Sequence, residues 1–263
     1  MKAIVLAAGR GERLRPITNQ IPKPLISIDN KTLLERNIES LYLSGIREIV
    51  VNSSWLAKQL EVFLSTINYP NLKIIYLYEG ERPLGTAGAI FNAIDYLKDD
   101  YFWVVNSDIL TNYSFKRIKT NNKQKAHLIL VPNPDHNSEG DFGLMDGIVC
   151  NHSDQMYTFS GISLLSPEMF EKQDKKTESL ATILRDFVEK DIVTGDIFYG
   201  EWLDIGTLER LNKAKNKIEI SIGRQRVNWG INTIWNSNDL FNAYNFIDFD
   251  YIERPGSDVI RFQ

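Results

Sequence analysis

Short apolar runs alternate with amphipathic segments in the amino-terminal part of the chain. The apolar runs predict buried strands at Lys2–Leu6, Glu48–Asn52, Lys73–Tyr78 and Tyr101–Val105. The segments between them carry apolar residues three or four positions apart, which is the spacing of a helix with one buried face. Strands separated by such helices predict an α/β fold: a doubly wound, mostly parallel (Rossmann-like) mixed sheet with helices on both faces.

Polar residues and glycines predict where these helices begin and end. Thr32-Leu33-Leu34-Glu35 is a capping box that opens a helix, and Gly45 ends it. Ser54 is expected to cap a second helix that runs through Leu64. A third helix is expected over Thr86–Leu97.

The pattern is more mixed after residue 126. Strands are predicted at Ala126–Val131, Tyr157–Leu165 and Ile192–Phe198, and helices at Ser179–Lys190 and from Thr207 to about Lys217. A loop rich in Asn, Asp, Pro and Gly is expected over 132–147. Residues 1–220 are therefore expected to form one domain with two halves, 1–112 and 113–220.

The segment 221–263 has a different composition from the rest. It is rich in Asn, Asp and aromatic residues, namely Trp229, Trp235, Phe241, Tyr244, Phe246, Phe249 and Tyr251. So many aromatic side chains argue against disorder. We expect this extension to pack on the main domain or on a partner subunit.

Composition and charge exclude several classes of protein. A formal net charge of -4 argues against general nucleic-acid binding, because proteins that bind the phosphate backbone are usually basic. A single cysteine, Cys150, excludes an intrachain disulfide and favours a reducing compartment. No signal peptide and no apolar run long enough to span a bilayer are found, so a cytoplasmic protein without membrane contact is expected.

Candidate chemistry first appears directly after the first strand. The segment Leu6-Ala7-Ala8-Gly9-Arg10-Gly11-Glu12-Arg13-Leu14-Arg15-Pro16 joins glycines to several arginines, and Pro22-Lys23-Pro24 follows. Glycines free backbone N–H groups, and the arginines add positive charge at the same place. The flanking prolines restrict the backbone around Lys23. This loop is therefore predicted to bind phosphate.

Two known phosphate loops do not match this segment. A P-loop requires Gly-Lys-Ser/Thr, which is absent, and a dinucleotide fingerprint requires a third glycine where this chain has the Arg13 region. What is left is a loop that wraps a nucleoside triphosphate and supplies arginine to its phosphates.

The loop and three later motifs resemble the sugar-1-phosphate nucleotidyltransferase family. Those motifs are Pro83-Leu84-Gly85-Thr86-Ala87-Gly88, Val105-Asn106-Ser107-Asp108 and Trp202-Leu203-Asp204-Ile205-Gly206-Thr207. The resemblance covers residues 1–217. It implies that 1–112 is the nucleotide-binding half and 113–220 the sugar-phosphate-binding half.

Other stretches of the chain bear on the substrates. His127–Pro134, Glu139–Leu144 and Thr158–Ile162 are most similar to the N-acetylmuramate 1-phosphate uridylyltransferases. Leu84–Gly88 looks more like mannose-1-phosphate guanylyltransferases. Relatives that use uridine or thymidine nucleotides often have a glutamine five positions before Gly85, whereas this chain has Gly80. The choice of base stays open at this point.

The resemblance implies roles for particular residues. Arg13 and Lys23 are the expected catalytic residues: Arg13 would grip the triphosphate, and Lys23 would bridge the α-phosphate and the sugar phosphate. The expected nucleotide-binding residues are Leu6, Ala8, Gly9, Gly11, Arg13, Lys23, Gly85, Thr86 and Asn106. The expected sugar-phosphate-binding residues are Asp141, Gly143, Ser160 and Gly161.

Two aspartates are the expected metal ligands. Asp108 and Asp204 each follow an apolar run, and carboxylates suit Mg²⁺, which usually takes one or two of them. Mg²⁺ is thus the expected cofactor. Ser107 stands where relatives usually have Gly, which could narrow access to the metal.

The sequence therefore predicts an enzyme that joins a nucleoside triphosphate to a sugar 1-phosphate and releases pyrophosphate. UTP with N-acetylmuramate 1-phosphate is favoured, giving UDP-N-acetylmuramate for cell-wall recycling. Mannose-1-phosphate guanylyltransferase and glucose-1-phosphate thymidylyl- or uridylyltransferase are the alternatives within the class. A non-catalytic, nucleotide-sensing regulatory subunit is the alternative outside it, and homodimer formation is left open.

Overall fold

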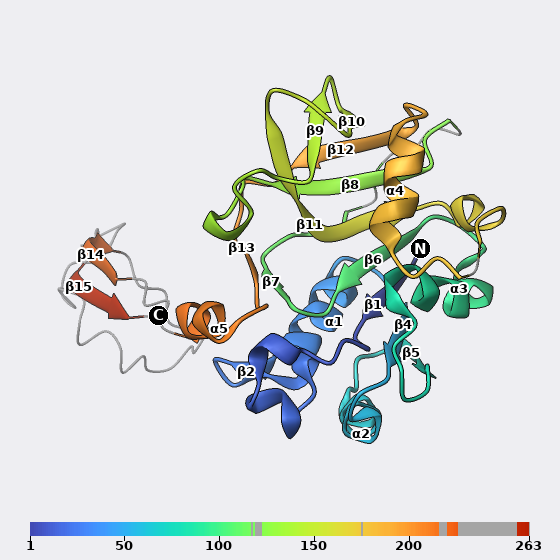
Figure 1. Ribbon diagram of the computed structural model, residues 1–263. Helices are drawn as coiled ribbons and strands as arrows, with labels where there is room; N and C mark the ends of the chain where they lie inside the picture. Colours follow the sequence, from blue (N-terminus) through green and yellow to red (C-terminus); the bar gives the residue numbers. More distant parts are fainter. Residues whose placement is uncertain (117, 119–122, 175, 216–219, 226–256, 263) are drawn as a thin grey trace, which may run out of the picture. The chain divides into compact units, whose positions relative to one another are not determined.

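A mixed sheet runs through the main body of the molecule (Figure 1). The computed structural model describes residues 1–116, 118, 123–174, 176–215, 220–225 and 257–262. The chain divides into two compact units, Met1–Lys215 and Asn216–Gln263. The sheet belongs to the first unit, and its described strands follow the order β5-β4-β1-β6-β11-β8-β12-β10-β9.

One side of this sheet is parallel. It consists of β5 (Lys73–Tyr78), β4 (Glu48–Ser53), β1 (Lys2–Leu6) and β6 (Phe102–Asn106). Each of these strands runs parallel to its neighbour, so their carboxyl ends meet at one edge of the sheet. Ligands in open α/β sheets bind outside that edge.

The other side is mixed. β11 (Met156–Leu165) lies antiparallel between β6 and β8 (Ala126–Val131), and β12 (Val193–Ile197) is parallel to β8. The pairing of β11 with β8 shifts register between Phe159 and Ile162. β9 (Phe142–Met145) and β10 (Ile148–Cys150) form a hairpin, and β9 also pairs antiparallel with the start of β11.

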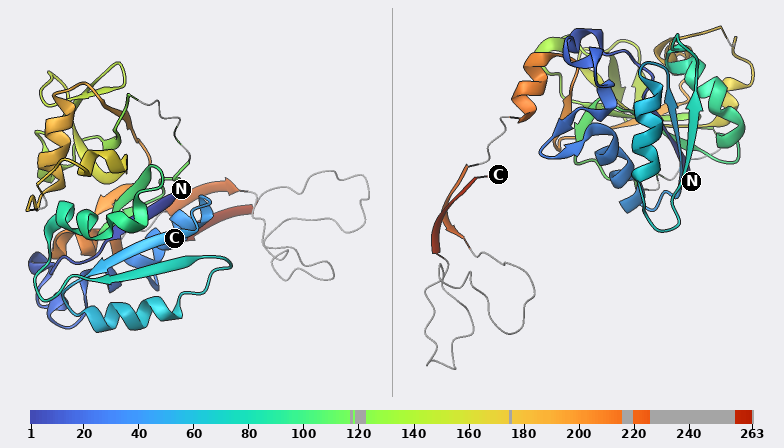
Figure 2. Two further views of the ribbon diagram at one scale, coloured as in Figure 1. Left: turned by 90° about the vertical axis from the view of Figure 1, so that its right-hand side faces the viewer. Right: turned by 90° about the horizontal axis from the view of Figure 1, so that it is seen from below.

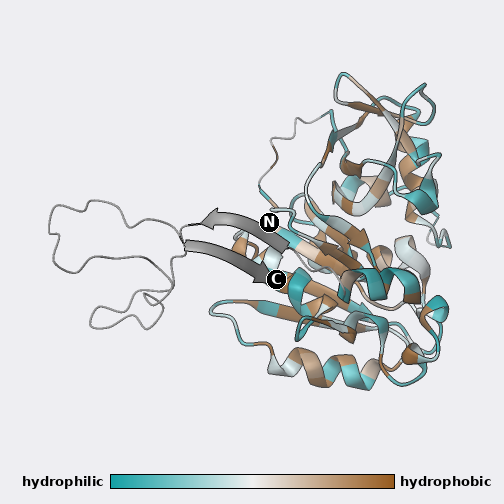
Figure 3. Ribbon diagram, turned by 90° about the vertical axis from the view of Figure 1, so that its left-hand side faces the viewer, coloured by the Kyte–Doolittle hydropathy of each residue, from teal (hydrophilic) through white to brown (hydrophobic). Residues whose placement is uncertain are grey.

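Helices cover both faces of the sheet (Figures 1 and 2). α1 (Leu33–Leu43) and α2 (Ala57–Thr66) pack on one face, and α3 (Gly85–Leu97) and α4 (Leu180–Val188) on the other. Alternate strand residues point to opposite faces, so Val5 and Val51 join the first core while Ile4 and Val50 join the second. The strands between the helices are accordingly largely hydrophobic in Figure 3.

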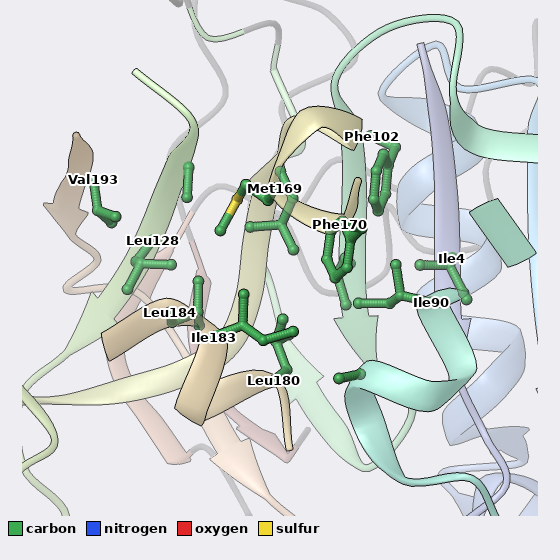
Figure 4. Packing of buried hydrophobic residues seen from close by; sticks show 14 of the residues in the cluster. Ile4, Ile90, Phe102, Leu128, Met169, Phe170, Leu180, Ile183, Leu184 and Val193 are labelled. Atoms are coloured by element: carbon green, nitrogen blue, oxygen red, sulfur yellow. The ribbon is translucent and has the colours of Figure 1, made fainter. Parts of the chain in front are cut away.

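The core beneath α3 and α4 is continuous across both halves of the chain. Figure 4 shows Leu180, Ile183 and Leu184 of α4 directed toward the sheet, with Ile90 of α3 beside Phe170. The rings of Phe91 and Phe170 meet edge to face at 5.5 Å between centroids. The helix and sheet layers predicted from the sequence are confirmed.

Two smaller ladders complete this unit. β7 (Ile109–Thr111) pairs antiparallel with β13 (Trp202–Asp204), and β2 (Ser27–Ile28) with β3 (Lys31–Thr32). α5 (Leu208–Lys215) follows β13 and packs in a third hydrophobic cluster that includes Leu14 and Ile28. Through this cluster, the chain that follows the phosphate loop packs against α5, the last helix of this unit.

The helix caps show one confirmed prediction and one error. The Thr32 hydroxyl accepts a hydrogen bond from the Glu35 N–H at 3.1 Å, as the capping box predicts. Ser54 does not cap α2; its hydroxyl donates to the Gly80 carbonyl at 2.8 Å instead. The helix begins later, after Leu56, which has a positive φ of 51°. A tertiary partner in the segment after β5 thus takes the hydroxyl that would have capped the helix.

The loop expected over 132–147 contains regular structure that the sequence analysis missed. β9 lies within it, and the turn at Asp146 and Gly147 leads into β10. In the second unit, β14 (Ile220–Gln225) pairs antiparallel with β15 (Ser257–Phe262). The aromatic residues named for the extension lie outside the described residues. Among the described residues, no helix is long and apolar enough to cross a membrane.

Candidate active site

A cleft of about 310 Å³ opens at the edge where the parallel strands end. It is lined by Leu6, Ala8, Gly9, Lys23, Asn52, Pro83, Gly85, Thr86, Asn106, Ser107 and Asp108. These residues lie at the carboxyl ends of β1, β4 and β6 or directly after them, in the 3₁₀ turn at Lys23, and at the start of α3, so they come from distant parts of the sequence. The structure therefore brings together most of the predicted nucleotide-binding residues at one place.

The phosphate loop leaves β1 and turns at Gly11. This glycine has a φ of 63°, and an added Cβ would lie 3.0 Å from Thr18 Cγ2 and 3.1 Å from Lys23 Cβ. Its carbonyl accepts hydrogen bonds from the Leu14 N–H and the Thr18 hydroxyl, both at 2.9 Å. A side chain at this position would be strained and crowded, so glycine is required for the turn that brings the loop close to Lys23.

Lys23 and Asp108 form an ion pair in the wall of the cleft. Lys23 begins a short 3₁₀ turn (Lys23–Leu25) directly after Pro22, and its side-chain ammonium contacts the Asp108 carboxylate. The two side chains are 13% and 25% exposed, so solvent screens the pair only in part. The contact joins two predicted site residues from motifs that are far apart in the chain.

The arginines of the loop lie outside the lining of the cleft. Arg13 is exposed on a 3₁₀ turn (Glu12–Leu14), and Arg15 lies 3.4 Å from Glu12. The guanidinium of Arg10 stacks on the ring of Trp55 at 5.1 Å. A catalytic contact of Arg13 with a triphosphate stays a prediction, because it requires the exposed side chain to reach the cleft.

The amino end of α3 forms another wall. Gly85 has a φ of 78°, and an added Cβ would lie 2.4 Å from the Glu178 carbonyl oxygen. The same carbonyl accepts a hydrogen bond from the Ala87 N–H at 2.9 Å. The Thr86 hydroxyl accepts from the Leu180 N–H at 2.8 Å. Thus Gly85 and Thr86 line the cleft while they also attach the segment before α4.

Asn106 ends β6 and faces the bulge of β11. Gly161, at a φ of 78°, lies so close that an added Cβ would be 2.6 Å from Asn106 Nδ2. Ser107 is 6% exposed, and its N–H donates to the Leu6 carbonyl at 3.1 Å. The predicted acceptor residue Gly161 therefore contacts the predicted nucleotide residue Asn106, which places the junction of the two halves at the cleft.

The two candidate metal ligands lie on neighbouring strands. Asp108 immediately precedes β7, Asp204 ends β13, and the Ile205 N–H donates to the Asp108 carbonyl at 2.8 Å. The backbones of the two residues are thus adjacent, but of the two only Asp108 lines the cleft, so binding of Mg²⁺ by this pair stays a prediction. Among the described residues there is no group of three or more acidic, His or Cys residues suited to a metal. A divalent ion here would therefore rely on this pair.

Each of these carboxylates has a basic partner. Asp108 pairs with Lys23, whereas both carboxyl oxygens of Asp204 accept from the Arg210 guanidinium at 2.6 Å. His136 Nε2 lies 3.1 Å from Asp204 Oδ1. Arg210 and His136 were not predicted as site residues from the sequence, because their proximity to Asp204 arises only when the 132–141 loop and α5 fold together.

The predicted acceptor residues have mostly structural contacts. Asp141 Oδ2 accepts from the Phe159 N–H at 2.8 Å and from Asn137 Nδ2 at 3.1 Å. The Ser160 hydroxyl donates to the Ile129 carbonyl at 2.6 Å and is buried. At Gly143, an added Cβ would lie 2.4 Å from Ser153 Cβ. Their contact with a sugar phosphate stays a prediction.

The sequence analysis also missed Asn52, at the carboxyl end of β4. Its side chain lines the cleft and accepts a hydrogen bond from the Ala7 N–H at 2.7 Å. Its amide donates to Glu79 at 2.8 Å. The signal available in the sequence was a polar residue that ends an apolar strand, as Asn106 does.

Comparisons with known proteins agree with this site. The nucleotidyl transferase family matches residues 2–221. The N-acetylmuramate alpha-1-phosphate uridylyltransferase of Neisseria meningitidis serogroup B is 38% identical over 224 residues, which are 82% of this chain and 97% of that protein. The mannose-1-phosphate guanylyltransferase catalytic subunit beta of Danio rerio is 30% identical over 78% of this chain, and the match spans 61% of its own length.

Solved structures show the same fold. HddC from Yersinia pseudotuberculosis superposes with a TM-score of 0.69 at 28% identity, over 82% of this chain and 98% of that one. The inositol-1-phosphate CTP transferase from T. maritima has a TM-score of 0.64 at 22% identity, over 82% and 96% of the two chains. The chain belongs to the nucleotidyl transferase family. It is an enzyme of the nucleotidyltransferase class, as the motifs predicted.

Proposed function

We propose that this enzyme transfers a uridylyl group from UTP to N-acetylmuramate 1-phosphate, giving UDP-N-acetylmuramate and pyrophosphate. The 38% identity to the Neisseria uridylyltransferase, over nearly its whole length, supports this choice of substrates. The shorter and lower identity to the mannose-1-phosphate guanylyltransferases makes GTP with mannose 1-phosphate the second candidate. The proposal also includes a cytoplasmic location, which cell fractionation tests. It further includes a homodimer, which sedimentation tests.

The contact of Lys23 with Asp108 at the cleft is the observation that best supports nucleotidyl transfer as the reaction. It places a cation and a carboxylate beside the glycine turn, where the phosphates of a nucleotide would lie. The acceptor's phosphate is already ionised at neutral pH, so its oxygen attacks without a general base. A bond forms between that oxygen and the α-phosphorus, the bond from the α-phosphorus to the bridging oxygen breaks, and pyrophosphate leaves.

The chain's own groups then bind and orient the two substrates. Lys23 lies where it can neutralise charge on the α-phosphate and the incoming sugar phosphate. Asn106 and Gly161 meet where the two halves join, so they limit the approach of the acceptor. When bound, Mg²⁺ would be held by Asp108 and Asp204 and would supply charge neutralisation on the phosphates.

The test is a grid of UTP, GTP, CTP and dTTP against N-acetylmuramate, mannose and glucose 1-phosphates, with pyrophosphate release as the readout. Release is expected to be greatest for UTP with N-acetylmuramate 1-phosphate, and to stop when EDTA removes divalent ions. Preference for GTP with mannose 1-phosphate would replace the proposed substrates. No release from any pair would favour a nucleotide-sensing subunit.

A further inference from the structure

The orientation of the Asn52 amide is fixed by two partners. Its Oδ1 accepts from the Ala7 N–H at 2.7 Å, and its Nδ2 donates to Glu79 Oε1 at 2.8 Å. A backbone N–H can only donate and a carboxylate can only accept, so the amide cannot be turned over. Asn52 is only 2% exposed, yet it forms part of the wall of the cleft.

Glu79 connects this amide to the loop before α3. Its second carboxyl oxygen accepts from the Leu84 N–H at 3.0 Å, and its own N–H donates to the Ser53 carbonyl at 2.9 Å. Both carboxyl oxygens of Glu79 therefore accept hydrogen bonds from groups of the protein itself. Leu84 directly precedes Gly85, which lines the cleft at the amino end of α3. The Glu79 carboxylate therefore fixes the position of Asn52 relative to this wall of the cleft.

Asn52 holds the first residues of the phosphate loop and lies on the opposite side of β1 from Asp108. It is the last residue but one of β4, whereas Asp108 follows β6, and β1 runs between these two strands. Two strand spacings amount to about 10 Å. With the phosphates at Lys23 and Asp108, the far edge of the base points toward β4. Gly80, which follows β5 on this side of the sheet, has no side chain, and an added Cβ there would meet nothing within 4 Å.

We infer that Asn52 selects the nucleobase by donating its second amide hydrogen to the carbonyl oxygen that distinguishes uracil from cytosine, and that Glu79 is a positioning residue for this amide. The inference rests on the proposed uridylyl transfer and names the side chain that sets the base. One amide hydrogen is taken by Glu79, and the other is left for a ligand in the cleft. An amino group at the same place on cytosine would set donor against donor.

The expected discrimination follows from the cost of an unpaired polar group. A buried donor without an acceptor costs about 1–3 kcal/mol, which corresponds to roughly a 5- to 150-fold preference for UTP over CTP. The same amide also favours dTTP over CTP, because thymine carries the same carbonyl. Selection between uracil and thymine must come from other groups.

A double substitution can reverse the polarity of this pair and keep its hydrogen bonds. In Asn52→Asp with Glu79→Gln, the Ala7 N–H still meets an oxygen, the new glutamine amide donates to the new carboxylate, and its oxygen still accepts from the Leu84 N–H. The net charge is unchanged. The cleft, however, gains an acceptor where it had a donor. The UTP to CTP ratio, measured as equilibrium binding by calorimetry and as kcat/KM, is expected to fall at least tenfold.

Matched controls separate selectivity from folding. Asn92→Asp with Asp95→Asn makes the same exchange on exposed positions of α3 and is expected to leave the ratio unchanged. Asn52→Asp alone sets two carboxylates against each other and is expected to lower the melting temperature, which the second substitution restores. A folded double variant with the wild-type ratio would overturn the inference.

If the double variant does not fold, Glu79→Gln alone decides the matter. Glutamine has one oxygen for two donors, so the amide loosens and the ratio is expected to fall severalfold; an unchanged ratio overturns the inference. Nucleotide binding is measured without the acceptor. A selective protein that releases no pyrophosphate would therefore contradict the proposed function alone, and an active protein without selectivity would contradict the inference alone.

Discussion

The half of the main body that is predicted to bind the nucleotide (the nucleotide half) and the half that is predicted to bind the acceptor (the acceptor half) differ in the contacts of their predicted site residues. In the nucleotide half, residues from three strand ends and the start of α3 line one cleft, and the backbone of parallel strands places them there. In the acceptor half, the polar atoms of Asp141 and Ser160 are engaged by the chain itself. Most of the motif residues in the first half line the cleft, whereas Asp141 and Ser160 in the second half form hydrogen bonds within the chain.

The largest expected effect tests the nucleotide half at Lys23. Lys23→Met removes the cation that contacts Asp108, and loss of one such electrostatic contact lowers turnover by about 10²–10³. Initial rates of pyrophosphate release measure this. Lys31→Met is the control, because Lys31 pairs with Glu39 and does not line the cleft; it is expected to keep near-normal rates. A Lys23 variant within threefold of wild type would remove this residue from the mechanism.

The junction of the two halves can be tested at Gly161. Gly161→Ala has a strained φ of 78° and also crowds Asn106, so both stability and activity are expected to fall. Gly147→Ala has nearly the same φ of 79° but open space around it. The difference between the two variants measures the crowding against Asn106 and Ile109, at about 1–3 kcal/mol in urea unfolding. Equal losses would mean that Asn106 and Ile109 move away at no cost.

A smaller effect is expected at Asp141, where it tests whether this residue of the acceptor half has a structural role. Asp141→Ala leaves the Phe159 N–H and the Asn137 amide without their acceptor, which costs about 1–3 kcal/mol of unfolding free energy. Asp141→Asn keeps one oxygen that can accept both bonds, so stability is expected to return. Its KM for the acceptor is expected to stay within threefold. A large rise in that KM with intact stability would instead support direct sugar-phosphate binding.

The smallest expected effect concerns His127, in β8 of the acceptor half. Burial lowers the pKa of its imidazole, although Asp196 nearby acts in the opposite direction. The unfolded chain therefore takes up the proton first as the pH falls below about 6.5, and stability decreases there by at most about 1.4 kcal/mol per pH unit. His127→Gln is expected to flatten this part of the curve of unfolding free energy against pH. An unchanged slope would assign it to other groups.

The sequence was informative where local pattern and tertiary structure agree. Buried strands such as Lys2–Leu6 are continuous apolar runs, and the Thr32 capping box works within four residues, so both were predictable. Ser54 was misread because its partner is the Gly80 carbonyl, on the chain that leaves the neighbouring strand. The hairpin after residue 141 was missed because its turn residues resemble those of an irregular loop.

The site shows the same limit. Gly9, Lys23 and Asp108 were predictable because they belong to motifs that follow or accompany predicted strands. Asn52 was not, since its role depends on contacts with Ala7 and Glu79 that no sequence pattern encodes. Hydrogen bonds between distant segments decide which polar groups line the cleft and which are engaged within the chain.

The position of β11 in the sheet has a consequence for synthesis of the protein. β6 has β1 on one side, and its other edge is covered by β11, which a ribosome makes only after the chain has reached residue 165. Until then the amino-terminal strands can pair, but β6 presents open backbone groups, which attract other chains. The close approach of Gly161 to Asn106 is also absent at that stage. A truncated chain that ends before β11 would thus carry the phosphate loop yet be prone to self-association.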